Sequence, residues 1–148
     1  TRTRGNWRKV MVEQWKPPER VHDGVRVTFI NHATVLLQFG GLNIITDPVW
    51  AYRASPFSFL GPIRYALPGV ALKDLPPIDI VLLSHNHYDH LDLATLRHIA
   101  STSHPRIYTG LGNAAYLASK GIPGAIDLDW WGRWEEPISS SPSISPWR

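Results

Sequence analysis

The chain has 148 residues, of which 43% are hydrophobic and 18% are charged, and its formal net charge is +3. This length and balance are typical of one folded domain with a substantial core. No apolar run reaches the length of a membrane-spanning helix. The absence of cysteine excludes disulfides and thiolate ligands, so histidine and carboxylates are the strong metal ligands that remain.

Residues 1–24 form a polar lead-in that is interrupted by two consecutive prolines. Its basic side chains are interleaved with tryptophan, and the residues concerned are Arg2, Arg4, Trp7, Arg8, Lys9 and Trp15. Such a segment can touch anionic headgroups or nucleic acid, but we favour a solvated tail. The first residues lack an apolar signal core, and the chain begins without methionine, which suggests processing or a fragment. We expect a cytoplasmic or peripheral membrane location.

The folded domain is predicted to begin near residue 25 with three strands. Residues 25–30 and 34–39 are rich in β-branched and aliphatic side chains. Gly40-Gly41 is a tight-turn signal ahead of a third such run at 42–46. The pattern predicts a meander that ends at Asp47-Pro48.

The next stretch, residues 49–77, is rich in proline and aromatic residues and is predicted to be a long loop. Its aromatic side chains include Trp50, Tyr52, Phe57, Phe59 and Tyr65. They could form an apolar wall at a substrate entrance, or they could pin the loop to the core. The sequence does not choose between these two roles.

The most informative stretch follows residues 78–84, an apolar run that predicts a buried strand. His85, His87, Asp89 and His90 come directly after it in an H-x-H-x-D-H pattern. On an extended backbone the first two histidines point the same way, and the following turn can bring the Asp-His pair to a second position nearby. The pattern indicates metal binding with room for two ions, and zinc is the first choice. A cluster of ordinary surface histidines is the less favoured alternative.

Two further polar residues lie next to predicted strand ends. Asp47 could hydrogen-bond a ligand imidazole, with a turn or core-polar role as the alternative. His32 could lie near the metal site or on the surface. Asn86 and Tyr88, between the ligands, are expected to support the site rather than bind metal. The remaining histidines have no ligand-like surroundings and are predicted to be surface residues: His22, His98 and His104.

Helices and strands alternate after the motif. In order, the sequence predicts a helix over 93–100, a strand over 106–109, a helix over 111–120 and a strand over 126–130. Asp92 is a good N-cap for the first of these helices, and Gly121 ends the second. The alternation predicts an α/β unit.

With these elements in place, the sequence resembles the metallo-β-lactamase superfamily, whose signature is H-x-H-x-D-H after a strand. Flanking motifs make it similar to one branch, the N-acylphosphatidylethanolamine-hydrolysing phospholipase D family. These motifs lie at residues 31–37, 41–48, 53–56, 75–79, 84–92 and 128–131. The resemblance covers residues 27–131, and the L-ascorbate-6-phosphate lactonase-like hydrolases share part of the pattern.

The resemblance implies an α+β fold, the αββα metallo-β-lactamase sandwich, of which this chain would form the N-terminal half. It implies a first metal held by His85 and His87. Asp89 and His90 would hold the second metal, and these two residues are the catalytic candidates. Zinc is the implied cofactor, with two ions in a complete family member. The implied reaction is hydrolysis of the phosphodiester of N-acylphosphatidylethanolamine by a metal-bound hydroxide, with a phospholipid substrate and a peripheral membrane contact.

The chain departs from the family after Trp131. Family members supply a third histidine, a bridging aspartate and a last histidine from later sequence, whereas residues 132–148 form a divergent Ser/Pro-rich tail without His or Asp. We therefore expect a truncated hydrolase in which residues 25–131 form half of the domain. Half a sandwich would expose an apolar sheet face that a second copy could cover, as a homo-oligomer.

Three functional hypotheses follow. The first is the phospholipase D-type phosphodiesterase. The second is another hydrolase of the superfamily, such as a lactonase acting on a small soluble substrate. The third is an inactive fragment or a module that binds metal or lipid, because four ligands divided over two metals leave both sites underfilled. A nucleic-acid partner is not expected.

Overall fold

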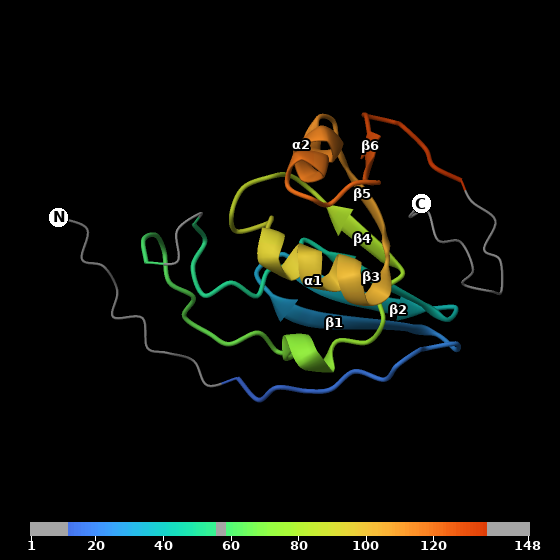
Figure 1. The fold of residues 1–148 in the computed structure, drawn as a ribbon. Helices are drawn as coiled ribbons and strands as arrows, with labels where there is room; N and C mark the ends of the chain where they lie inside the picture. The colour runs from blue at the N-terminus through green and yellow to red at the C-terminus, as the bar shows by residue number, and fades with distance from the viewer. Residues whose placement is uncertain (1–11, 56–58, 136–148) are drawn as a thin grey trace.

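A computed structural model of the chain describes residues 12–55 and 59–135. Those residues form a mixed sheet of six strands in the order β1-β2-β3-β4-β5-β6, with its helices on one side (Figure 1). The strands are β1 (Val25–Asn31), β2 (Thr34–Phe39), β3 (Leu42–Thr46), β4 (Ile80–Leu83), β5 (Arg106–Gly110) and β6 (Ile126–Leu128). The helices are the 3₁₀ helix η1 (Leu72–Asp74), α1 (Leu93–Ser103) and α2 (Asn113–Ser119).

The first three strands form the antiparallel meander that the sequence predicts. In the β2–β3 turn Gly40 and Gly41 have φ values of 56° and 78°, which a residue with a Cβ rarely adopts. The register pairs Leu36 with Ile45, and both side chains are fully buried. The alternation of apolar side chains therefore decides which face of the meander is covered.

The strands from β3 to β6 are parallel, and α1 and α2 form the crossovers that join β4 to β5 and β5 to β6. Asp92 caps α1 as the sequence predicts, because its side chain accepts hydrogen bonds from the N–H groups of Ala94 and Thr95. The helix runs on to Ser103 and ends at His104, which has a left-handed φ of 49°. This parallel half is the predicted α/β unit.

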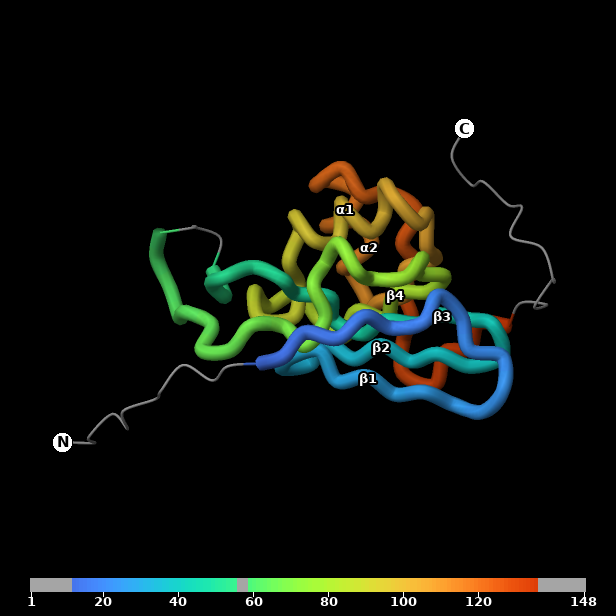
Figure 2. The backbone as a smooth tube through the Cα atoms, turned by 90° about the horizontal axis from the view of Figure 1, so that it is seen from below, coloured from blue at the N-terminus to red at the C-terminus, as the bar shows by residue number. Residues whose placement is uncertain are grey.

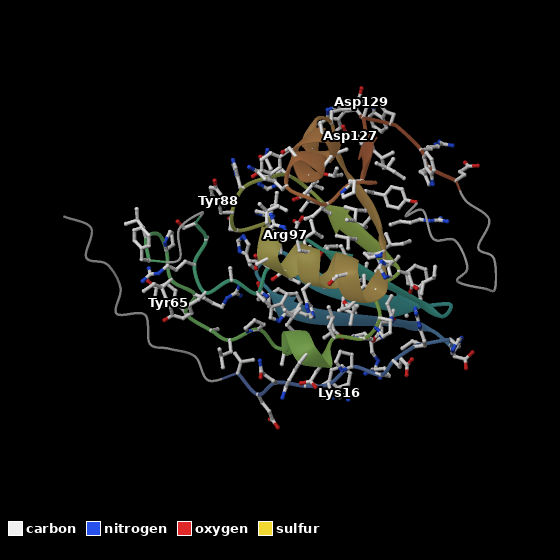
Figure 3. The ribbon with its side chains drawn as sticks, in the orientation of Figure 1. Lys16, Tyr65, Tyr88, Arg97, Asp127 and Asp129 are labelled. Carbon is white, nitrogen blue, oxygen red and sulfur yellow. The ribbon has the colours of Figure 1, made fainter. Side chains whose placement is uncertain are left out.

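Several element boundaries differ from the prediction by one to three residues, and at three of them a carboxylate accepts a backbone N–H. Asp79 accepts an N–H of β3 at 2.7 Å, and β4 starts only after it. Asp127 of β6 accepts two N–H groups at the start of α2, which begins at Asn113 rather than at position 111 (Figure 3). Asp129 accepts the next N–H at 2.7 Å, and β6 ends before it.

One face of the sheet is covered and holds the core. Its buried side chains come from both strands and helices, and they include Leu36, Ile45, Val81, Leu96, Ile99, Ile107 and Leu117. Residues 12–24 have no helix or strand but follow the same face, where Gln38 and Asn43 donate to the carbonyls of Pro18 and Glu19, each at 2.9 Å (Figure 2). This segment therefore helps to close the core.

The opposite face of the sheet is open at β1. Val25, Val27 and Phe29 are 70%, 63% and 67% exposed. This is the apolar face that half a sandwich is expected to leave uncovered. Among the described residues no helix has the length and apolar character needed to cross a bilayer.

The division into a lead-in, a half-domain and a tail stays a prediction. The basic cluster at Arg2, Arg4, Arg8 and Lys9 lies outside the described residues, as do Trp7, Phe57 and most of the Ser/Pro-rich tail.

Candidate metal centre

Three strand ends place the candidate site at one edge of the sheet. β1 runs in the same direction as β3, because two antiparallel pairings separate them, and β4 is parallel to β3. His32, Asp47 and the loop that starts at Ser84 follow the carboxyl ends of these strands. Open sheets with parallel strands bind ligands at this edge. Residues that are far apart in the sequence consequently meet here.

The H-x-H-x-D-H loop folds back on itself between β4 and α1. The N–H groups of His90 and Leu91 reach the carbonyl of His87 at 2.9 and 2.7 Å. The ring of His85 lies 4.6 Å from the ring of His87 and 4.1 Å from that of His90. His85 Nε2 and His87 Nδ1 are 3.2 Å apart. The turn thus brings three imidazoles of the motif together.

Asp47 lies under this loop and is almost fully buried. Its two carboxylate oxygens accept hydrogen bonds from the N–H and the hydroxyl of Ser84, both at 2.7 Å. Its Oδ2 also lies 2.8 Å from His90 Nδ1. The backbone of Asp47 has a φ of 35°, a left-handed conformation that costs about 1–2 kcal/mol. The hydrogen bonds to both carboxylate oxygens hold the Asp47 backbone in this conformation.

These contacts determine which ring nitrogens carry protons. A carboxylate only accepts, so His90 donates from Nδ1 and keeps the lone pair of Nε2. The hydroxyl of Ser84 donates to Asp47, so its oxygen accepts from His85 Nδ1 at 2.8 Å. His85 therefore also keeps its lone pair on Nε2. Both histidines are prepared to bind a cation through this atom.

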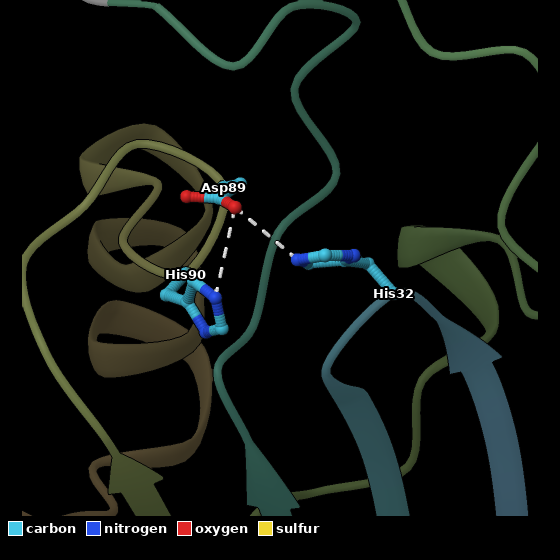
Figure 4. Close-up of side chains that lie close together, drawn as sticks. All are labelled: His32, Asp89 and His90. Carbon is cyan, nitrogen blue, oxygen red and sulfur yellow. Dashed lines mark ion pairs between the residues drawn. The ribbon is translucent and has the colours of Figure 1, made fainter.

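His32 faces the loop from the β1–β2 turn (Figure 4). Its Nε2 lies 3.2 Å from Asp89 Oδ2, and His90 Nε2 lies 3.7 Å from the same oxygen. Although burial by itself raises the pKa of Asp89, a backbone hydrogen bond and the neighbouring His90 and His32 lower it below its usual value. Asp89 is thus held as a carboxylate between two imidazoles.

The donor set fits metal ions. Imidazole and carboxylate are ligands of zinc and of iron, and the donor atoms here fall into two groups. His85 and His87 offer one pair of donors. His32, Asp89 and His90 offer one donor atom each, all within 4.8 Å of one another. The other described histidines, His22, His98 and His104, are exposed and lie outside this group.

Two cavities adjoin the candidate metal centre. One of about 150 Å³ is lined by His32, Asp89 and Arg64, among others. The other, of about 410 Å³, is lined by Asn86 and Tyr88 from the motif loop and by Arg97 of α1 (Figure 3). Both are hollows of the surface beside the ligands rather than a closed pocket.

The aromatic residues of the long loop divide between the two roles considered above. Trp50 pins the loop, because it packs on the core and its ring N–H donates to the carbonyl of Val70 at 2.9 Å. Tyr52 lines both cavities. Phe59 and Tyr65 are exposed and line neither cavity. Only Tyr52, among the described aromatic residues of this loop, forms part of a wall next to the ligands.

Two residues that the sequence did not single out shape the site. Ser84 links Asp47 to His85, and its position directly before the first histidine was the only signal. Arg64 anchors the long loop by donating to the carbonyls of Val49 and Ala51 at 3.0 and 3.1 Å. Burial lowers the pKa of Arg64, an effect that nearby Asp92 opposes. No local pattern marks Arg64.

Residues 42–140 match the model of the Beta-lactamase superfamily domain. The chain belongs to this superfamily. It is 38% identical over 131 residues to "N-acyl-phosphatidylethanolamine-hydrolyzing phospholipase D 1" of Caenorhabditis elegans, a match that covers 84% of this chain and 36% of the worm protein. The mitochondrial enzyme of that name from Saccharomyces cerevisiae is 33% identical over 107 residues, covering 70% of this chain and 22% of the yeast protein. The sequence resemblance is confirmed, and the chain spans about a third or less of these relatives.

Solved structures of the superfamily share the fold. An isothiocyanate hydrolase from Delia radicum gut bacteria has a TM-score of 0.56 and 30% identity, over 70% of this chain and 41% of that one. CmlA, a diiron β-hydroxylase from Streptomyces venezuelae, has a TM-score of 0.53 and 25% identity, over 76% of this chain and 21% of that one. The predicted partial sandwich is thereby confirmed. Because CmlA is a diiron enzyme, the fold does not fix the metal.

Proposed function

We propose that this chain provides the metal-binding part of a zinc-dependent phosphodiesterase that hydrolyses N-acylphosphatidylethanolamine. The observation that supports it is the meeting of four imidazoles and two carboxylates at one sheet edge, in a chain 38% identical to such a phospholipase. The products would be phosphatidate and an N-acylethanolamine.

In this proposal the motif holds two ions. His85 Nε2 and His87 Nδ1, which lie 3.2 Å apart, bind the first ion. Asp89 and His90 bind the second ion and act at the reacting phosphate. When bound, such ions lower the pKa of a coordinated water and stabilise negative charge on a phosphoryl oxygen. Asp47 keeps His90 in the tautomer and orientation that the site requires.

Exposed apolar groups on the long loop support a lipid substrate. Phe59 and Leu60 are 77% and 61% exposed on the long loop, which also contributes Tyr52 to both cavities. Arg53 lines the larger cavity and offers a cation near a phosphate. We infer a peripheral contact with a lipid surface through this loop, since exposed apolar patches mark such contacts.

Turnover in labelled water tests the proposal. The full chain, loaded with zinc, is incubated with vesicles that contain N-acylphosphatidylethanolamine in H₂¹⁸O, and the products are analysed by mass spectrometry. Attack of water on phosphorus breaks the P–O bond to the ethanolamine oxygen, so the label is expected in phosphatidate and not in the N-acylethanolamine. His87→Ala should abolish the product, whereas His98→Ala, on the exposed side of α1, should not. A chain that binds zinc but releases no product would instead support the reading as an inactive metal-binding module.

A second candidate is a hydrolase of a small soluble substrate. It is favoured by the 30% identity to an isothiocyanate hydrolase and by the cavity of about 150 Å³ beside His32, which is smaller than the pockets that hold drug-sized ligands. The same zinc-loaded chain would then turn over soluble isothiocyanates or lactones but not the vesicle lipid, and His87→Ala would remove that activity.

A further inference from the structure

We propose that His32 binds a metal ion directly, as a third protein ligand beside Asp89 and His90. This inference rests on the proposed metal-dependent function and extends it to a residue outside the H-x-H-x-D-H motif. His32 lies in the β1–β2 turn, more than fifty positions before the motif, and the turn aims its ring at Asp89 (Figure 4).

The distances between donor atoms match a shared ion. Zinc–nitrogen and zinc–oxygen bonds of about 2.0–2.1 Å in a tetrahedron place neighbouring ligand atoms about 3.3–3.4 Å apart. His32 Nε2 lies 3.2 Å from Asp89 Oδ2, and His90 Nε2 lies 3.7 Å from it. These two edges need shifts of only a few tenths of an ångström to fit one ion, and all three donor atoms lie within 4.8 Å of one another.

The number of ligands points the same way. Catalytic zinc sites have three protein ligands and one open position for water or substrate. Asp89 and His90 of the motif supply two donor atoms. His32 completes the set of three, and no other described group of histidines and carboxylates has three donor atoms so close together. His85 and His87 remain a two-ligand pair.

The β1–β2 turn holds His32 in place. His32 has a φ of 36°, a value that residues with a Cβ rarely adopt. On one side Asn31 donates to the carbonyl of Val49 at 3.1 Å, and on the other side the carbonyl of Ala33 accepts from Thr46 Oγ1 at 2.7 Å. The ring therefore approaches Asp89 from a fixed backbone, and little order has to be gained when an ion binds.

Unequal metal affinity is the consequence. A three-ligand site and a two-ligand site in one chain should fill in sequence, with one tight ion and one weak ion. A purely electrostatic role for His32, as a hydrogen-bond donor to Asp89, would leave Asp89 and His90 without the third ligand that makes their site the tighter one.

Metal titrations separate the two roles of His32. Metal-free full chain is titrated with Co²⁺ or Zn²⁺ against a competing chelator, for the wild type, His32→Ala, His32→Asn and the control His98→Ala. Loss of a residue that hydrogen-bonds a metal ligand already weakens metal binding about 10- to 100-fold. Loss of a ligand itself should therefore weaken binding at the tight site at least about 100-fold. His32→Asn keeps an amide donor for Asp89 but is a poor ligand, so it should behave like His32→Ala.

A direct readout accompanies the titration. With ¹¹³Cd²⁺ and ¹⁵N-labelled histidine, the Nε2 signal that is absent from His32→Asn should show coupling to cadmium. Wild-type affinity in His32→Asn, or no coupling at that signal while His90→Ala loses metal, would overturn the inference and leave the proposed function intact. A wild-type chain that binds no metal at all would overturn both. Circular dichroism of each metal-free variant checks that the fold is retained.

Discussion

The side chain of Asp47 provides a strong test of how the metal centre is organised. It accepts three hydrogen bonds, from Ser84 N and Ser84 Oγ at 2.7 Å each and from His90 Nδ1 at 2.8 Å. In Asp47→Asn the remaining oxygen can still accept from Ser84 N, but the new NH₂ group faces the hydroxyl and the ring. His90 must then accept at Nδ1, which moves its proton to Nε2, the atom that faces Asp89.

The expected loss of metal affinity follows from this change of tautomer. His90 has to return its proton to Nδ1, against the new donor, before Nε2 can bind an ion. Disruption of such a partner of a ligand costs about 10- to 100-fold in metal affinity. In the metal-free chain the substitution also replaces a charged acceptor by a neutral amide. A hydrogen bond to a charged group is worth about 1.5–3 kcal/mol, so the free energy of unfolding should fall by about the value of one such bond.

The assay compares Asp47→Asn with Asp127→Asn. Asp127 also accepts two hydrogen bonds, from the N–H groups of Gly112 and Ala114 at 2.9 and 2.8 Å, but it caps α2 and touches no ligand. Both variants should unfold at lower urea concentration in the metal-free state. Only Asp47→Asn should lose zinc affinity in a competition with a chelator. Unchanged zinc affinity in a folded Asp47→Asn chain would refute the tautomer argument.

Three further predictions concern stability and association. Asp92→Ala removes the cap of α1 and leaves the N–H of Ala51 without its acceptor, while the N–H of Trp50 keeps only Thr95 Oγ1, so urea unfolding should show a loss of about 2–4 kcal/mol. Leu36→Ala creates a cavity in the core and should cost about 2–5 kcal/mol in the same measurement, whereas a cost under 1 kcal/mol would mean a loosely packed core. Phe29→Ser on the open face should reduce self-association in sedimentation velocity without loss of unfolding free energy, because the side chain is 67% exposed.

The parts of the site that the sequence predicted are local in the chain. The H-x-H-x-D-H spacing lies within six positions, so the geometry of one turn is enough to bring its rings together. The cap of α1 by Asp92 is local for the same reason. Such features depend on neighbouring residues, and a sequence pattern contains that information.

The parts that the sequence left open depend on the order of the strands. His32 could be placed at the site only once β1, β3 and β4 were known to run in the same direction. The start of α2 was misplaced because its capping carboxylate, Asp127, comes from a strand that lies later in the chain. Arg64 likewise donates to the carbonyls of Val49 and Ala51, which lie more than ten positions earlier in the chain. Contacts of this kind are fixed by the tertiary fold, and helix or strand periodicity does not reveal them.

Metal binding and burial of the open face are separate properties of this fold. Every donor of the metal centre lies at the carboxyl ends of β1, β3 and β4, and Asp47 fixes His90 from the covered side. Val27 and Phe29 point to the opposite side of β1 and take part in none of the hydrogen bonds that orient the ligands. The metal site can therefore be preorganised while the apolar face is still uncovered. Metal affinity and self-association should consequently vary independently in variants of the two regions.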